Sequence, residues 1–308
     1  MRWQTFAVCA GLVRAQDRSQ GMRGKRRMRM QGKVAVITGA ASGIGRRTAE
    51  RVVEEGGRVI LADIQDAAGQ RLAETLGEAT RFIRCDVTRE ADIAAAVALA
   101  ERIWGRLDLM FNNAGRPGVP DPIESMPAEG WDEAMAVLLR SVMLGIKHAA
   151  PVMTRQGGGA IVNTASVAGL IPGSTATAYS VAKSAVIQLT KCAALELAGQ
   201  GVRVNCICPG VIATPIFGRS AGLPTQLDAK VAEEAARTAA GMHPLGREGR
   251  ADDIADGVLY LADDRAGFVT GIALTIDGGL AAGMTPAQRG ALWAPLRSAV
   301  NALADDAR

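Results

Sequence analysis

The stretch that decides the fold is Val34-Ala-Val-Ile-Thr-Gly39-Ala-Ala-Ser-Gly43-Ile-Gly45, where an apolar, β-branched run leads directly into a glycine-rich turn. The run predicts a buried strand over Lys33–Thr38, and the spacing of apolar residues over Ile44–Glu55 predicts a helix. Such a strand-to-helix turn points backbone N–H groups and the helix dipole at one spot, which suits a pyrophosphate. Gly39 permits the tight turn, Gly43 lets the backbone approach a ligand, and Gly45 permits close helix–strand packing.

Beyond this stretch, short apolar runs alternate with helical patterns. Further strands are expected at Arg58–Asp63, Arg81–Asp86, Leu107–Asn112, Ala160–Ala165, Val202–Ile207 and Ile272–Ile276. Most runs are almost continuously apolar, which is typical of strands covered on both faces, and β–α alternation is typical of parallel strands joined by right-handed crossovers. We predict an α/β fold, a single-domain Rossmann fold with a doubly wound, seven-stranded parallel sheet flanked by helices.

Composition and charge exclude several classes of protein. Of the 308 residues, 48% are hydrophobic and 21% charged, which argues against disorder, and 4% are aromatic, which argues against a base-stacking surface for nucleic acid. No run of 18 apolar residues occurs, so we expect no membrane-spanning helix. The net charge of +4 originates in residues 1–31, and the remainder carries −3. A polyanionic partner is therefore not expected.

Cysteine and histidine usage points to a reduced protein without a metal site. The five cysteines are scattered without a C-x-x-C motif, and only two histidines, His148 and His243, are present. We expect no bound metal and a cytoplasmic location. Cys206 and Cys208 are interpreted as small buried apolar residues, His148 as a packing or solvent residue, and His243 as part of a structural turn.

An acid follows the glycine-rich turn at the distance that dinucleotide sites use. Asp63 ends the second expected strand, 18 residues after Gly45. A carboxylate there accepts hydrogen bonds from the ribose hydroxyls of the adenosine and repels the 2′-phosphate of NADP. Its neighbours Ala62 and Ile64 are not basic and do not offset that repulsion. The sequence therefore favours NAD as the cofactor.

Tyr179 and Lys183 stand four residues apart at the start of a helical stretch, so their side chains should share one face. An ammonium near a phenol favours the phenolate and should lower the tyrosine pKa towards the working range. Such a tyrosine can exchange a proton with an alcohol while a hydride moves to or from nicotinamide. Ser166 ends the fifth expected strand, thirteen residues earlier, and its hydroxyl could orient the substrate oxygen.

Other candidate residues also follow strands. They are Asp86 and Val87 after the third strand, Asn113, Ala114 and Gly115 after the fourth, and Pro209, Gly210, Ile212 and Thr214 after the sixth. The carboxyl ends of parallel strands meet at the edge of the sheet where open α/β folds bind ligands. We therefore expect these residues to gather around one site.

In order, the motifs T-G-x-x-x-G-x-G, D-V, N-N-A-G, S-x12-Y-x-x-x-K and P-G-x-x-x-T are highly specific together, and over about residues 32–280 the chain resembles the short-chain dehydrogenase/reductase family. The resemblance implies that Tyr179 is the acid/base, that Ser166 positions the substrate, and that Lys183 also holds the nicotinamide ribose. It implies a homotetramer packed through the expected helices Pro127–Gln156 and Thr175–Gly199.

The same resemblance implies a set of contacts with NAD. Gly39, Ser42, Ile44 and Asp63 would contact the phosphates and the adenosine ribose. Asp86 and Val87 would contact the adenine, and Asn113 would lie beside the cofactor. Thr214 and the Ile212 backbone would receive the carboxamide. The cofactor-binding set also contains Gly43, Gly45, Ala114, Gly115, Pro209 and Gly210.

One position departs from the family pattern. The motif N-L-x-G-x-F-L-G, whose Asn holds a water that relays protons to the lysine, matches residues 138–145, where Leu138 replaces the Asn. A leucine makes no hydrogen bond, so the relay is in doubt, and Ser141, one turn on, is a candidate substitute.

Both ends of the chain differ from the regular pattern. We expect residues 1–31 to be a basic extension, disordered or beginning at a misassigned start, with Met22, Met28 and Met30 as alternative starts. Residues 32–280 form the expected dinucleotide-binding catalytic domain, with a substrate loop at 210–250. Residues 281–308 form an expected helical extension whose apolar face (Leu292, Trp293, Leu296, Val300 and Leu303) should pack on the domain, with a role in lining the site as the alternative.

The function expected from the sequence is an NAD-dependent oxidoreductase that interconverts a secondary alcohol and a ketone. The loops 116–127, 168–177 and 212–242 are mostly apolar, and Leu138, Ile171, Ile216, Phe217 and Leu223 suggest a hydrophobic or cyclic substrate. One alternative is a 3-oxoacyl-thioester reductase. Another, from a different class, is an NAD-binding protein with weak or no turnover because of Leu138.

Overall fold

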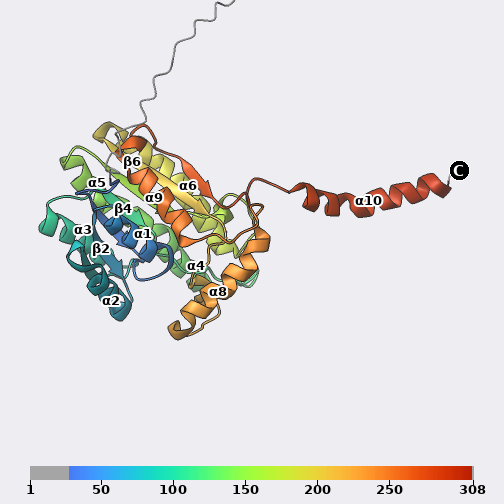
Figure 1. The fold of residues 1–308 in the computed structure, drawn as a ribbon, viewed down its shortest axis with the longest axis horizontal. Coiled ribbons are helices and arrows are strands. Elements are labelled where there is room, and N and C mark those ends of the chain that lie inside the picture. Colours follow the sequence, from blue (N-terminus) through green and yellow to red (C-terminus); the bar gives the residue numbers. More distant parts are fainter. Residues whose placement is uncertain (1–27, 307–308) are drawn as a thin grey trace, which may run out of the picture.

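A computed structural model describes residues 28–306 and contains one seven-stranded sheet with helices on both faces (Figure 1). The strands are β1 Val34–Thr38, β2 Arg58–Asp63, β3 Thr80–Arg84, β4 Leu109–Asn112, β5 Gly159–Thr164, β6 Val202–Pro209 and β7 Ala273–Ile276. All pair in parallel, in the order β3-β2-β1-β4-β5-β6-β7. The predicted α/β fold and parallel sheet are confirmed, with strand bounds shifted by at most two residues.

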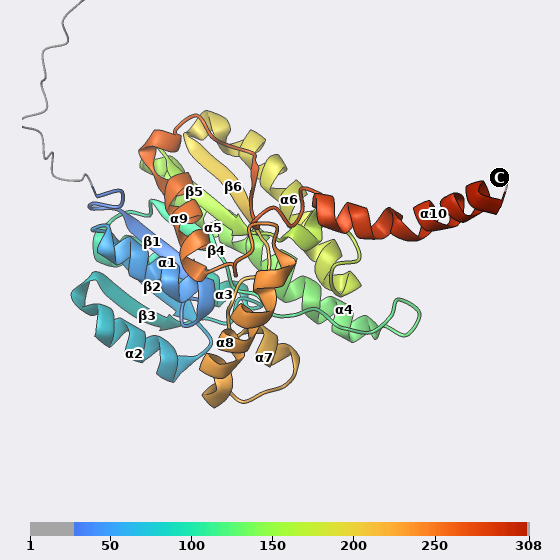
Figure 2. The same ribbon diagram turned by 45° about the vertical axis from the view of Figure 1, so that its right-hand side comes forward.

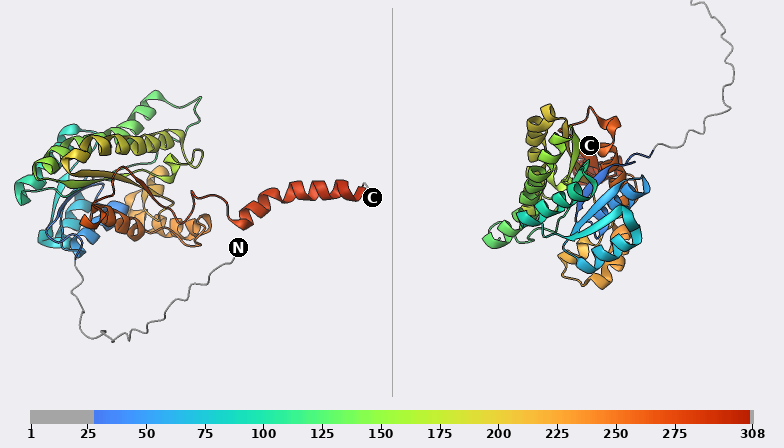
Figure 3. Two further views of the ribbon diagram at one scale, coloured as in Figure 1. Left: turned by 90° about the horizontal axis from the view of Figure 1, so that it is seen from above. Right: turned by 90° about the vertical axis from the view of Figure 1, so that its left-hand side faces the viewer.

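The helices divide into two layers, which Figure 3 shows above and below the sheet. One layer holds α3 (Glu90–Trp104), α5 (Ser141–Arg155) and α6 (Thr177–Leu197), and the other holds α1 (Gly43–Glu54), α2 (Asp66–Leu76) and α9 (Ala251–Ala262). Each layer buries its own hydrophobic cluster against the sheet. Cys206 and Cys208, both fully buried on β6, belong to the α3–α5–α6 cluster, as expected of small apolar residues.

A long helix precedes β5. It runs from Ala128 to Arg155 and consists of α4 (Ala128–Met135), a π-helical turn at Ala136–Arg140, and α5. It is long and apolar enough to cross a membrane, which the criterion of consecutive apolar residues did not reveal, but half of its most apolar window is buried inside the protein. We interpret it as a core helix that packs on the sheet.

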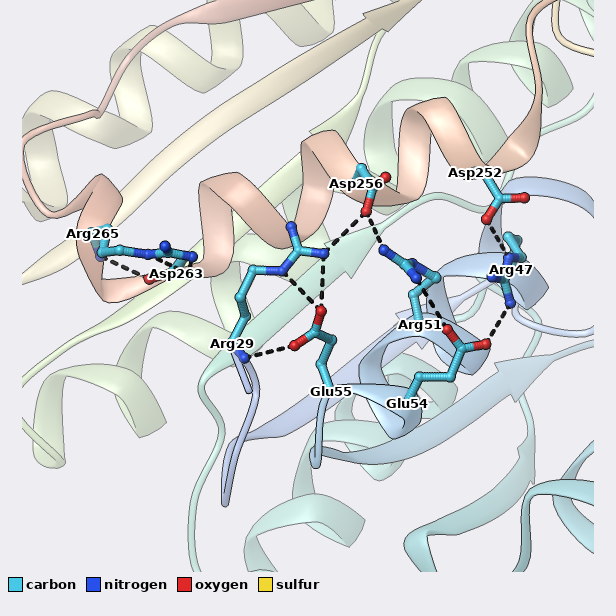
Figure 4. Close-up of polar contacts among 9 residues, drawn as sticks. All are labelled: Arg29, Arg47, Arg51, Glu54, Glu55, Asp252, Asp256, Asp263 and Arg265. Carbon is cyan, nitrogen blue, oxygen red and sulfur yellow. Dashed lines mark hydrogen bonds and ion pairs between the residues drawn. The ribbon is translucent and has the colours of Figure 1, made fainter. Parts of the chain in front are cut away.

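Helices α1 and α9 are joined by a seam of paired charges (Figure 4). Arg47 bonds Glu54 on its own helix and Asp252 on α9, and Arg51 in the same way bonds Glu54 and Asp256. We call these residues the α1–α9 charged seam. It fixes the position of α9 over α1.

The body begins earlier than predicted. Met30 is fully buried, and Arg29 forms ion pairs with Glu55 and Asp256. The expected boundary at residue 32 is therefore wrong, because residues 28–31 pack against the end of α1. Residues 1–27 lie outside the described part of the chain.

The predicted substrate loop contains two helices, α7 (Ile216–Ser220) and α8 (Asp228–Ala239). The last helix, α10 (Pro286–Asp306), includes Pro295 and extends away from the body (Figures 1 and 2). Its Leu292, Trp293, Leu296 and Val300 are each about half exposed. The expectation that this apolar face packs on the domain is therefore wrong for the described single chain.

Candidate active site

The site lies where the strand order reverses, between β1 and β4 at their carboxyl ends. The Asn113 amide donates to the carbonyls of Thr38 and Gly39, and the Thr38 hydroxyl accepts the backbone N–H groups of Asn113 and Ala114. These bonds fix the β4 loop against the glycine-rich turn. Asn113 therefore holds the turn in place as well as lying next to it.

Each glycine of the turn occupies a position that a side chain could not share. A Cβ on Gly45 would lie 2.1 Å from the Gly39 carbonyl oxygen, and one on Gly39, where φ is +65°, would lie 2.9 Å from the Ala114 Cα. Gly43 has a φ of +54° and approaches the Thr214 side chain, to which a Cβ would come within 3.3 Å. The close approach at Gly43 thus brings together the turn and the loop after β6 (residues 210–214, the β6 loop), two parts of the predicted site. Ser42 stands at the N-cap position of α1, and Ile44 follows in its first turn.

Asp63 is buried at the end of β2 and faces the same turn. Its carboxylate accepts the backbone N–H groups of Ala41 at 2.8 Å and Gln65 at 2.9 Å. Arg84 is its neighbour on β3, a basic residue that the argument from sequence neighbours missed. The Arg84 guanidinium is bonded to the Asp66 carboxylate and the Ile64 carbonyl.

Asp86 and Val87 follow β3 at the same edge of the sheet. The Thr88 hydroxyl and backbone N–H donate to the Asp86 carboxylate, and these bonds hold its pKa below the ordinary value. Val87 is buried. Asp86 is thus an ionised group next to an apolar side chain.

The side chains expected to carry the chemistry lie on α6 and directly after β5. Tyr179 and Lys183 share one face of α6 as predicted, and the Lys183 Nζ lies 5.5 Å from the centre of the Tyr179 ring. Ser166 lies close enough to the Tyr179 hydroxyl to lower its pKa, and the Ser166 oxygen accepts the Ala168 N–H. The buried Lys183 Nζ donates to the Thr164 carbonyl at 2.6 Å. The structure therefore brings these three side chains together.

The electrostatics differ from the prediction. Burial raises the pKa of Tyr179, and the hydrogen bond from Ser166 only partly opposes this. Burial lowers the pKa of Lys183 to about 8. The expected lowering of the tyrosine pKa by Lys183 is therefore wrong for the free protein, because desolvation outweighs the other influences on the phenol.

Leu138 does not line an open pocket. It is fully buried on the π-helical turn and packs with Ala134, Ala178 and Ala182 in a small cluster beside Tyr179. The Ser141 hydroxyl, considered as a substitute for the missing Asn, donates to the Val137 carbonyl of its own helix at 2.6 Å. The region beside Tyr179 is thus apolar where the family pattern places an amide.

Two glycines that the sequence argument missed shape this region. A Cβ on Gly118 would lie 2.9 Å from the Tyr179 backbone nitrogen, and one on Gly169 would lie 2.6 Å from the Lys183 carbonyl carbon. Both loops therefore press directly on the helix that carries the tyrosine and the lysine. A glycine in an otherwise unremarkable loop was the signal available in the sequence.

The β6 loop completes the site. Pro209 ends β6, Gly210 approaches Asp277 after β7, and Ile212 and Thr214 are buried. The Ala213 N–H donates to the Gly249 carbonyl, which ties the loop to the segment before α9. This loop, the glycine-rich turn and the Tyr179 region surround one edge of the sheet.

These residues fit a dinucleotide. The turn offers backbone N–H groups at the start of α1, an ionisable carboxylate lies at the end of β2, and a buried lysine lies by β5. The glycines of the turn carry no side chain at the positions that reject a Cβ, as close approach by a ligand requires. Asp63 and Lys183 would hold the two riboses, and Thr214 would lie at the nicotinamide end.

Comparisons with known proteins agree with this geometry. The family profile described as Enoyl-(Acyl carrier protein) reductase matches residues 39–281. Momilactone A synthase of Oryza sativa subsp. japonica is 43% identical over 255 residues, which cover 82% of this chain and 91% of that protein. Borneol dehydrogenase, mitochondrial, of Lavandula x intermedia is 39% identical (82% and 92% covered). Cis-4-hydroxycyclohexanecarboxylate dehydrogenase of Sinomonas cyclohexanicum is 37% identical (81% and 97%). The chain therefore belongs to the short-chain dehydrogenase/reductase family.

Proposed function

We propose that this protein is an NAD-dependent oxidoreductase that interconverts a secondary alcohol and a ketone. Family membership implies an oxidoreductase with a nicotinamide cofactor, NAD or NADP. The observation that carries the proposal is the placement of the Tyr179 phenol between Ser166, which lowers its pKa, and the buried Lys183, because a proton donor, a second hydroxyl and a cation then lie together. A protein that only bound the cofactor would not need this arrangement.

The residues act on the substrate oxygen. The nicotinamide, when bound, accepts or gives the hydride. Tyr179 removes the alcohol proton during oxidation and returns it during reduction, while Ser166 holds the oxygen beside the phenol. The Lys183 Nζ donates to the Thr164 carbonyl, and its positive charge stabilises the phenolate that forms when Tyr179 loses its proton. Because burial raises the Tyr179 pKa, oxidation should speed up with rising pH until Lys183, whose pKa is about 8, loses its charge.

Asp63 supports NAD rather than NADP. A buried carboxylate whose oxygens are already directed by two backbone N–H groups would repel a 2′-phosphate. Arg84, the neighbour of Asp63 on β3, is a cation that could offset this, and it is bonded to Asp66. Comparing NADH with NADPH decides between them, and Asp66→Ala with unchanged preference would show that Arg84 plays no part.

A hydrophobic or cyclic alcohol is the proposed substrate. Ile171, on the loop after β5, and Phe217 and Leu223, in the segment 210–250, are partly exposed. Two of the relatives are named for borneol and for a hydroxycyclohexanecarboxylate, both ring alcohols. These names and the apolar loops together favour ring alcohols over sugar phosphates.

The test follows NADH absorbance while the protein meets ring and open-chain ketones and a 3-oxoacyl thioester, with NAD and the matching alcohols in parallel. We expect turnover with ring ketones that falls by about 10²–10⁴-fold in Tyr179→Phe, with NADH binding retained. Retained activity in that variant would remove Tyr179 from its role. Preference for the thioester would favour the reductase alternative.

A second candidate function is cofactor binding without turnover. Leu138 favours it, because an apolar side chain occupies the place of the relay amide. NADH binding with no turnover on the panel, followed by turnover in Leu138→Asn, would establish this alternative.

We also propose a homo-oligomer, a tetramer by family resemblance, located in the cytoplasm. A shallow groove between the Ala128–Arg155 helix and α6 supports the assembly. It is mostly apolar and is lined by Met135, Leu139, Arg140, Met143, Ala185, Gln188, Leu189 and Cys192. Light scattering of the purified protein would measure the number of subunits.

A further inference from the structure

His243 occupies a buried position between the ends of two strands. It follows α8 and packs against the turn after β7, where a Cβ on Gly278 would lie 3.1 Å from the His243 Cβ. On its other side, its Nε2 accepts the backbone N–H of Val211 at 3.2 Å, and a Cβ on Gly210 would lie 3.0 Å from the same nitrogen. The imidazole therefore connects the β6 loop to the β7 turn.

The hydrogen bond from Val211 determines which tautomer the neutral His243 imidazole adopts. A nitrogen that accepts an N–H carries no proton, so a neutral His243 carries its proton on Nδ1. This Nδ1 is buried and has no hydrogen-bond partner among residues 28–306. A buried donor without a partner costs stability, which an apolar side chain of similar size would avoid. The benefit of histidine here is thus the acceptor that it offers to Val211.

The contact between Val211 and His243 joins the two ends of the segment 211–243, which contains α7 and α8. Val211 stands at its start and His243 near its end. A second closure lies beside it, where Ile212 pairs with Gly249 and the Ala213 N–H donates to the Gly249 carbonyl. Between them, the two contacts hold residues 211–213, directly before Thr214.

Asp277 is a charged group close to this contact. Its Cα and Cβ adjoin Gly210, and its carboxylate accepts the backbone N–H groups of Gly279 and Ala281. Arg247, in the segment after His243, is bonded to Asp253. The Asp277 carboxylate and the Arg247 guanidinium are thus bonded to other groups, and the Val211 N–H is accepted by the His243 Nε2.

We propose that His243 is a positioning residue for the nicotinamide half of the cofactor. By accepting the Val211 N–H it holds the β6 loop so that Ile212 and Thr214 can meet the carboxamide. The inference rests on the proposed function and extends it to a residue outside the catalytic set. It requires that His243 affect the nicotinamide end and leave the adenosine end, held by Asp63 and the glycine-rich turn, unchanged.

The test measures the affinities of NADH and of ADP-ribose, which lacks the nicotinamide, by calorimetry. In His243→Leu we expect NADH to bind about tenfold more weakly, the loss of roughly one buried hydrogen bond. ADP-ribose should bind within about twofold of the native protein. His243→Gln, whose side-chain oxygen can accept the same N–H, should restore NADH binding. The control is His148→Leu, which alters the second histidine of the chain, located on α5.

Equal weakening of both ligands in His243→Leu, or failure of His243→Gln to restore NADH binding in a protein with native circular dichroism, would overturn the inference. So would unchanged NADH binding in His243→Leu. Native protein that binds neither ligand would instead contradict the proposed function, so the two failures are distinguishable.

Discussion

The α1–α9 charged seam and the Tyr179–Lys183 site hold charges in opposite ways. In the seam, each arginine bonds at least two carboxylates at the edge of the protein (Figure 4). These bonds lower the pKa of Glu54 and raise that of Arg51. In the site, Lys183 is buried without a carboxylate partner among the described residues, and burial lowers its pKa.

This difference shows what each region contributes. Paired charges near solvent join two helices at a small net gain in stability. A buried ammonium bonded to one carbonyl costs stability, because water is lost and no opposite charge replaces it. Under the proposed function, this cost falls on the lysine that acts on the Tyr179 phenol and on the nicotinamide ribose. The following predictions test this contrast.

The largest effect is expected from Lys183→Met. Activity should fall by about 10²-fold or more, because the phenolate loses its cation. Without cofactor, stability at pH 7 should rise by about 1–3 kcal/mol, because the buried charge is removed. Lys191→Met, which alters an exposed lysine on the same helix, is the control.

The same variant should change the dependence of stability on pH. The pKa of Lys183 is about 8 in the folded protein and about 10.5 when exposed, so between these values the unfolded chain binds more protons. The unfolding free energy of the native protein should therefore rise with pH through this window, with the full cost present below pH 8. Urea titrations should show this rise reduced in Lys183→Met, and an unchanged slope would contradict the assignment.

The next effect is expected from Leu138→Asn, which puts an amide into the apolar cluster beside Tyr179. We expect a loss of about 2–3 kcal/mol in unfolding free energy, because the amide would be buried among alanines. Turnover should not exceed that of the native protein. Higher turnover would show that the site lacks a polar group it needs.

A smaller effect is expected in the seam. Asp256→Ala should lower the unfolding free energy by about 1 kcal/mol and leave activity unchanged, because Arg29 and Arg51 each keep a second carboxylate. The loss should shrink in 1 M salt, where the Debye length is about 3 Å. A loss that salt leaves unchanged would mean that packing, and not charge, accounts for it.

The smallest effect is expected from ending the chain after Gly283. Without α10 the melting temperature should stay the same, because its apolar side chains are exposed in the single chain. Melting curves at several protein concentrations provide the check. A concentration-dependent loss would show that α10 packs on another copy.

The sequence indicated which candidate residues would lie together because each motif stands at the end of a strand, and parallel strands end at one edge of the sheet. Ser166, Tyr179 and Lys183 come together as expected, as do the glycine-rich turn and Thr214. The prediction for the phenol failed because spacing along a helix specifies which side chains are neighbours and says nothing about how much water each one loses.

The order of apolar runs and glycines thus determined the sheet, its direction and the location of its site, since those follow from local patterns that repeat along the chain. Tertiary packing alone decided the burial of Lys183, the closed surroundings of Leu138, the contact between His243 and Val211, and the burial of Met30. Each depends on segments distant in sequence, because desolvation and hydrogen bonding are set by whatever the fold places next to a group.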